Sequence, residues 1–108
     1  MREILLLSKR LIKAKEFERI ALTNNINFED LKDGYVKLYN SQDDYIDIYL
    51  DSRDEKGKPE SLEDTLEIYK SIKLPFPRPY LTSLQVNLDT TNLIDIIINN
   101  LDCTKNEL

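Results

Sequence analysis

The chain has 108 residues, the size of one small domain, and its 20 acidic and 15 basic residues leave a net charge of −5. It contains no histidine and one cysteine, which excludes imidazole-dependent catalysis, a histidine-ligated zinc site and a disulfide within the chain. Proteins that bind a phosphate backbone usually carry an excess of basic residues, so the acidic balance argues against nucleic acid as the partner.

The N-terminal part of the chain allows two interpretations. Apolar residues recur every three or four positions from Ile4 to Ala21, and this periodicity favours a single amphipathic helix. Residues 2–8 alone would also suit a short buried strand, followed by a helix that begins near Lys13. In either case, we expect the helix to end at Asn24-Asn25.

Two antiparallel strands are predicted next, over residues 34–39 and 43–51. In both, apolar and polar side chains alternate strictly, which is typical of a strand with one buried face. The intervening residues 40–44 have the length of a hairpin loop. A register that stabilises the sheet through aromatic and unlike-charge pairs predicts three cross-strand pairs: Tyr39 with Tyr45, Lys37 with Asp47, and Tyr35 with Tyr49.

The next segment is predicted to be a polar loop followed by a helix. Residues 52–60 are charged and lack apolar side chains, so we expect a mobile surface loop. Ser61 opens a pattern close to a capping box, which predicts a helix to about Ile72. The alternating prolines of residues 74–79 are incompatible with a helix and indicate a rigid connector.

The C-terminal part predicts one strand and one helix. Alternation continues over residues 80–88, which predicts a third strand. Asp89 is a suitable N-cap for a helix from Thr90 to about Leu101. We expect residues 103–108 to form a frayed tail.

Together these elements predict a single domain over residues 1–108 of the α+β class. We expect a sandwich of a small, mostly antiparallel sheet with helices on one face or both, in the order α-β-β-α-β-α. If residues 2–8 form a strand, the order becomes β-α-β-β-α-β-α.

Residues that would support catalysis or cofactor binding are scarce. Cys103 has no histidine with which to form a catalytic pair. The two glycines do not form a phosphate-binding loop, and residues 51–57 depart from a calcium-binding loop because Arg53 stands at a ligand position. We therefore expect a protein that is not an enzyme, with no cofactor and no metal.

Targeting signals are also lacking in the sequence. The apolar run Ile4–Leu7 is too short for a secretory signal, and no stretch approaches the roughly 20 apolar residues of a membrane span. A single cysteine fits a reducing compartment. We expect a cytoplasmic protein that does not associate with membranes.

The most informative feature is an alternation of tyrosine and aspartate in the second predicted strand. Spacing by two places these side chains on one face, and the preceding strand adds two tyrosines. Tyrosine is enriched in recognition surfaces, and carboxylates beside it would attract a basic partner. The candidate partner-binding residues, including acidic neighbours in the adjoining loops, are Tyr35, Tyr39, Asp43, Asp44, Tyr45, Asp47, Tyr49, Asp51, Asp54 and Glu55. The alternative is an ordinary solvated sheet face, or one whose tyrosines are buried by a helix.

A short, acidic, histidine-free α+β chain with this Tyr/Asp-rich hairpin resembles the small cytoplasmic immunity proteins of bacterial polymorphic-toxin systems, including contact-dependent inhibition. The resemblance covers the whole chain in size, charge and element order. It implies tight one-to-one binding to a cognate basic toxin domain, often a nuclease, whose active site is occluded.

Three other functions remain open from the sequence. A phage-type inhibitor that mimics nucleic acid against a host enzyme would use the same face. A small carboxylate-based enzyme would need acidic side chains converging in a cleft. A homodimeric accessory domain would cover the tyrosines or an edge strand with a second copy of the chain. The sequence leaves open whether the free protein is a monomer or a homodimer.

Overall fold

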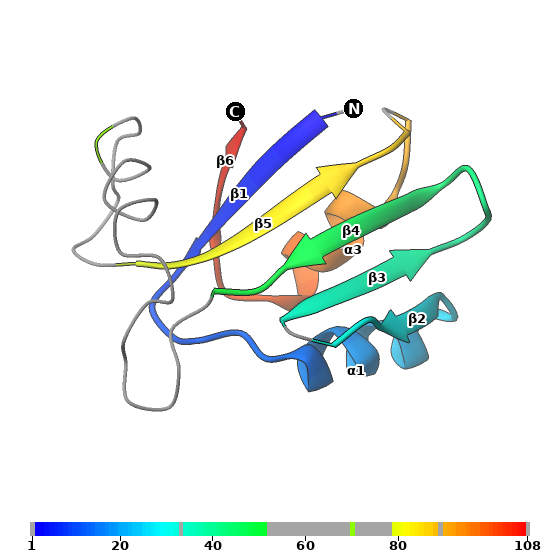
Figure 1. Ribbon diagram of the computed structural model, residues 1–108, viewed down its shortest axis with the longest axis horizontal. Coiled ribbons are helices and arrows are strands. Elements are labelled where there is room, and N and C mark those ends of the chain that lie inside the picture. The colour runs from blue at the N-terminus through cyan, green and yellow to red at the C-terminus, as the bar shows by residue number, and fades with distance from the viewer. Residues whose placement is uncertain (1, 33, 52–69, 71–78, 89, 108) are drawn as a thin grey trace.

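The computed structural model describes residues 2–32, 34–51, 70, 79–88 and 90–107. Over these residues the chain forms one antiparallel sheet with strand order β2-β3-β4-β5-β1-β6, together with two helices (Figure 1). The elements in chain order are β1 (Arg2–Ser8), α1 (Ala14–Asn24), β2 (Asn27–Asp30), β3 (Tyr35–Tyr39), β4 (Tyr45–Tyr49), β5 (Tyr80–Val86), α3 (Leu93–Asn100) and β6 (Thr104–Glu107).

Helices α1 and α3 pack on the same face of the sheet, and α3 lies behind the sheet in the view of Figure 1. Their inward side chains, such as Phe17 and Ile97, are fully buried in one cluster with apolar residues of the strands, such as Leu38 and Ile48. Sheet and helices therefore form two layers around one core. The predicted α+β class is confirmed, and the described part is mostly sheet.

Strand β1 replaces the helix that periodicity favoured for the N-terminus. It lies between β5 and β6 and pairs antiparallel with both. Ile4 and Leu6 belong to the core beneath the helices, while Leu5 and Leu7 are buried on the other face. A strand buried on both faces has a continuous apolar run instead of alternation, and such a run cannot be distinguished from a helix by its period.

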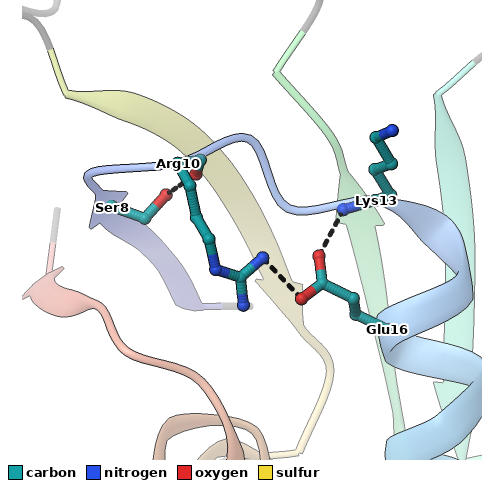
Figure 2. Close-up of polar contacts among 4 residues, drawn as sticks. All are labelled: Ser8, Arg10, Lys13 and Glu16. Atoms are coloured by element: carbon teal, nitrogen blue, oxygen red, sulfur yellow. Dashed lines mark hydrogen bonds and ion pairs between the residues drawn. The ribbon is translucent and has the colours of Figure 1, made fainter.

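Helix α1 begins at Ala14, close to the start that the strand interpretation predicts. Glu16 holds this end: its carboxylate accepts a hydrogen bond of 2.8 Å from the backbone N–H of Lys13 and forms an ion pair with Arg10 (Figure 2). An acidic side chain in the first turn also complements the helix dipole. The helix ends at Asn24, as predicted, and Asn25 adopts the left-handed conformation that closes helices.

The hairpin of β3 and β4 has the register that the sequence predicts. Tyr39 lies opposite Tyr45, Lys37 opposite Asp47, and Tyr35 opposite Tyr49. The apolar residues between these pairs are buried in the core beneath the helices: Val36, Leu38, Ile46 and Ile48. The polar and aromatic residues therefore share the opposite face of the sheet.

Two strands were missed, and the predicted element order is not confirmed. Strand β2 precedes the hairpin and pairs with β3. Strand β6 pairs with β1 where a frayed tail is expected for residues 103–108. Neither segment has enough alternating apolar residues to mark a strand, because both are short and mostly polar.

The third predicted strand is confirmed as β5, and the last helix begins at Leu93. The hydroxyl of Thr91 accepts a hydrogen bond of 3.1 Å from the Leu93 backbone N–H. Asp89, the predicted cap, lies outside the described residues. So do the expected mobile loop over residues 52–60 and all but Lys70 of the helix expected from Ser61.

Candidate partner-binding face

The face of the β3–β4 hairpin that points away from the helices carries four tyrosines, one lysine and one aspartate. We call it the tyrosine face: Tyr35, Lys37, Tyr39, Tyr45, Asp47 and Tyr49. Tyr49 is 48% exposed and the other five side chains are half-buried. Both described helices lie on the other side of the sheet, so neither covers these rings.

Two kinds of aromatic contact order the tyrosine face. The rings of Tyr35 and Tyr49 are stacked, with their centroids 4.7 Å apart. The ammonium of Lys37 lies 4.5 Å from the centroid of the Tyr45 ring and 5.6 Å from that of Tyr39. Both distances are short enough for cation–π attraction. The four rings therefore form two pairs, one stacked ring on ring and one gathered around a cation.

A row of polar residues crosses the tyrosine face and continues over the neighbouring strands. Cross-strand partners lie on the same side of a sheet, and the register aligns five of them in the order Glu29, Lys37, Asp47, Gln85 and Glu3. Adjacent strands are about 4.8 Å apart, so the row spans roughly 19 Å. With three carboxylates and one ammonium, it is net negative.

Sequence reasoning missed the contribution of Glu29 and Glu3 to this row. Glu29 belongs to β2, a strand of only four residues. Glu3 belongs to β1, which periodicity placed in a helix. The sequence signal for Glu29 is weak: it is the apolar Phe28 standing between two polar neighbours.

Tyr35 is held in its neutral form. Partial burial raises its pKa well above the usual range of a tyrosine, and the neighbouring Asp47 carboxylate and Tyr49 side chain raise it further. The phenol therefore stays uncharged to a more alkaline pH than an ordinary tyrosine. The charges on the face are those of Asp47 and Lys37, and Glu29 and Glu3 add negative charge from the neighbouring strands.

The predicted acidic residues at the hairpin loop have different roles. The carboxylate of Asp43 is exposed, although its backbone carbonyl accepts a 2.7 Å hydrogen bond from the Asn87 side chain. Asp44 instead closes the loop: its carboxylate accepts a 2.9 Å hydrogen bond from the Asn40 side chain. Asp43 is thus available to a partner, whereas Asp44 serves the conformation of the loop.

Asp51, at the other end of the hairpin, supports the sheet. Its carboxylate is in a half-buried residue and accepts a 2.7 Å hydrogen bond from the backbone N–H of Leu81, at the start of β5. We therefore leave Asp51 out of the candidate face, although its position in the alternation predicts it there. Asp54 and Glu55 lie outside the described residues.

Two hollows lined by described residues carry little reactive chemistry. A hollow of about 290 Å³ beside the end of β1 contains Cys103, whose thiol pKa is raised by burial and, to a smaller extent, by the Asp102 carboxylate. A thiol with a raised pKa is a poor nucleophile at neutral pH. A second hollow, of about 170 Å³, lies between α1 and the end of α3, where Arg10 and Glu16 form their ion pair.

The described residues hold neither a metal-binding cluster nor a membrane-spanning helix. In these parts of the chain, no three histidine, cysteine, aspartate or glutamate side chains gather closely enough to hold a metal ion. Neither described helix has the length and apolar character needed to cross a bilayer.

Comparison with known proteins returns no relative. No family model, no curated protein and no solved structure matches the chain.

Proposed function

We propose that the tyrosine face binds a basic protein domain, and that the chain neutralises this partner in the cytoplasm as a non-catalytic immunity protein. The observation that carries the proposal is the row of carboxylates set among four tyrosines, on a sheet face opposite both described helices. Tyrosine gives a large contact area with few rotatable bonds to immobilise. The carboxylates supply the charge complementarity that speeds association and selects the partner.

The proposed mechanism is steric and electrostatic. On a nuclease domain, a basic groove binds the phosphates of its substrate. The carboxylates of Glu29, Asp47 and Glu3 would occupy positions along this groove, with the tyrosine rings packed beside them. A substrate would then be excluded without any chemical step by the bound chain.

The experiment that tests the proposal is a growth assay. The chain is co-expressed with the C-terminal domain of the protein encoded immediately upstream of its gene. We expect this domain alone to stop bacterial growth and the chain to restore it, through a complex that survives size-exclusion chromatography.

Variants then locate the binding face. Replacing Asp43 and Asp47 by lysine is expected to abolish the rescue. Glu18→Lys, a charge reversal at an exposed position of α1, is the matched control and should still rescue growth. Rescue by the double variant as well as by the control would rule out this face, and an absence of both toxicity and complex would rule out the proposed partner.

A further inference from the structure

Lys37 lies at the centre of the tyrosine face, in surroundings that suit a cation. Its ammonium lies 4.5 Å from the ring centroid of Tyr45 and 5.6 Å from that of Tyr39, within the range of about 6 Å at which cation–π attraction operates. Glu29 and Asp47 are its direct cross-strand partners on the two neighbouring strands. Two aromatic rings therefore contact one positive charge, and a carboxylate residue lies opposite it on each neighbouring strand.

We propose that Tyr39, Tyr45, Glu29 and Asp47 form a cation subsite for a lysine or arginine side chain of a protein partner, and that Lys37 fills this subsite in the unbound protein. The inference rests on the proposed function, because it names the group that the tyrosine face recognises. Lys37 is the internal occupant, and binding requires the partner's cation to replace its ammonium over the rings.

The contacts of Lys37 allow such a replacement. Within the described part of the chain, it forms no ion pair with Glu29 or Asp47, and the contacts of its ammonium are those with the two rings. The side chain is long and flexible, and withdrawing it to solvent breaks no direct salt bridge. An arginine guanidinium is a strong competitor, because it is planar, stacks on aromatic rings and is less strongly hydrated than an ammonium.

The same face contains a natural comparison. Tyr35 and Tyr49 stack on each other, and no cation from the described residues lies over their rings. The subsite therefore belongs to one tyrosine pair of the two. A substitution in the stacked pair perturbs the face without removing the subsite.

The experiment is an NMR titration of the full chain with N-acetyl-L-arginine amide, which carries one guanidinium and no other charge. Lys37→Ala empties the subsite, and Lys37→Met removes the charge but keeps an unbranched side chain. We expect Lys37→Ala to bind the probe at least tenfold more tightly than the wild type, with the largest shift changes at Tyr39 and Tyr45. Lys37→Met should fall between the two, and the amide spectra establish that each variant is folded.

Two double variants, each adding one tyrosine substitution to Lys37→Ala, test whether the rings form the subsite. Tyr45→Leu is expected to abolish probe binding, whereas Tyr49→Leu should leave it within about twofold. Equal binding by the wild type and Lys37→Ala would overturn the role of Lys37. Equal losses from Tyr45→Leu and Tyr49→Leu would overturn the subsite. The titration uses a small molecule and no protein partner, so its result does not depend on the growth assay. A failed titration would overturn the subsite alone, and a failed growth assay would overturn the proposed function alone.

Discussion

The ring of Tyr35 on β3 stacks on the ring of Tyr49 on β4, with centroids 4.7 Å apart and an angle of 25° between the ring planes. Aromatic pairs of this kind contribute about 0.5–1.5 kcal/mol beyond the area that they bury. A double-mutant cycle with Tyr35→Ala and Tyr49→Ala is therefore expected to give a coupling energy in that range, measured from urea unfolding curves. Strictly additive losses would mean that the stack contributes nothing to folding.

The pKa of Tyr35 makes stability depend on alkaline pH. Because its folded-state pKa is raised above the usual value of about 10, the folded protein retains a proton that the unfolded chain releases. This contribution is complete below about pH 10 and is lost as the pH rises above that value. We expect the free energy of unfolding to fall from pH 9 to pH 11, and to fall less in Tyr35→Phe. Tyr39→Phe is the control, and an equal effect of both substitutions would contradict the assignment.

Asp51 is predicted to affect stability more than partner binding. Asp51→Ala leaves the Leu81 N–H without the acceptor that it has at 2.7 Å, and an unsatisfied donor of this kind costs about 1–3 kcal/mol. Asp51→Asn keeps an oxygen acceptor and should cost less. The comparison is Asp43→Ala, whose exposed carboxylate should change the free energy of unfolding by less than about 0.5 kcal/mol. Equal losses from Asp51→Ala and Asp43→Ala would show that the contact does not support β5.

Helix α1 offers a test of the core beneath the sheet. Phe17 is fully buried and Leu22, on the same helix, is 77% exposed. Phe17→Ala is expected to lower the free energy of unfolding by about 3–5 kcal/mol, whereas Leu22→Ala should change it by less than about 0.5 kcal/mol. Chemical denaturation measures both. Similar losses in the two variants would contradict the orientation of the helix.

The proposed binding face predicts a salt-dependent association rate. Replacing both Asp43 and Asp47 by lysine should slow association with the basic partner by about tenfold or more at low ionic strength. The difference should shrink at high salt, because screening shortens the reach of charges to a few ångströms. Asp51 stays unchanged in this variant, since its carboxylate supports β5. Stopped-flow kinetics would detect the change, and a rate that does not depend on salt would argue against electrostatic docking.

Local patterns were sufficient to predict the central hairpin. Val36 and Ile48 alternate with tyrosine and charged residues, and burying one set against helices necessarily turns the other set outward. The register that pairs aromatic rings and unlike charges across the two strands then placed Lys37 opposite Asp47, and the structure confirms it. The end of α1 at Asn24 was also predicted, because a left-handed asparagine closes a helix locally.

The sequence by itself thus determined the α+β class, the β3–β4 register and the tyrosines on its outer side, because short-range alternation governs all three. Only the tertiary structure decided that residues 2–8 are a strand, since Ile4–Leu7 is buried on both faces and carries no alternation. It also decided that β2 and β6 exist, because such short polar strands form only where another strand is present to pair with them. The partner of β2 is β3, and the partner of β6 is β1. The pairings of β2 with β3 and of β1 with β5 bring Glu29 and Glu3 into one row with Lys37 and Asp47, which no local pattern specifies.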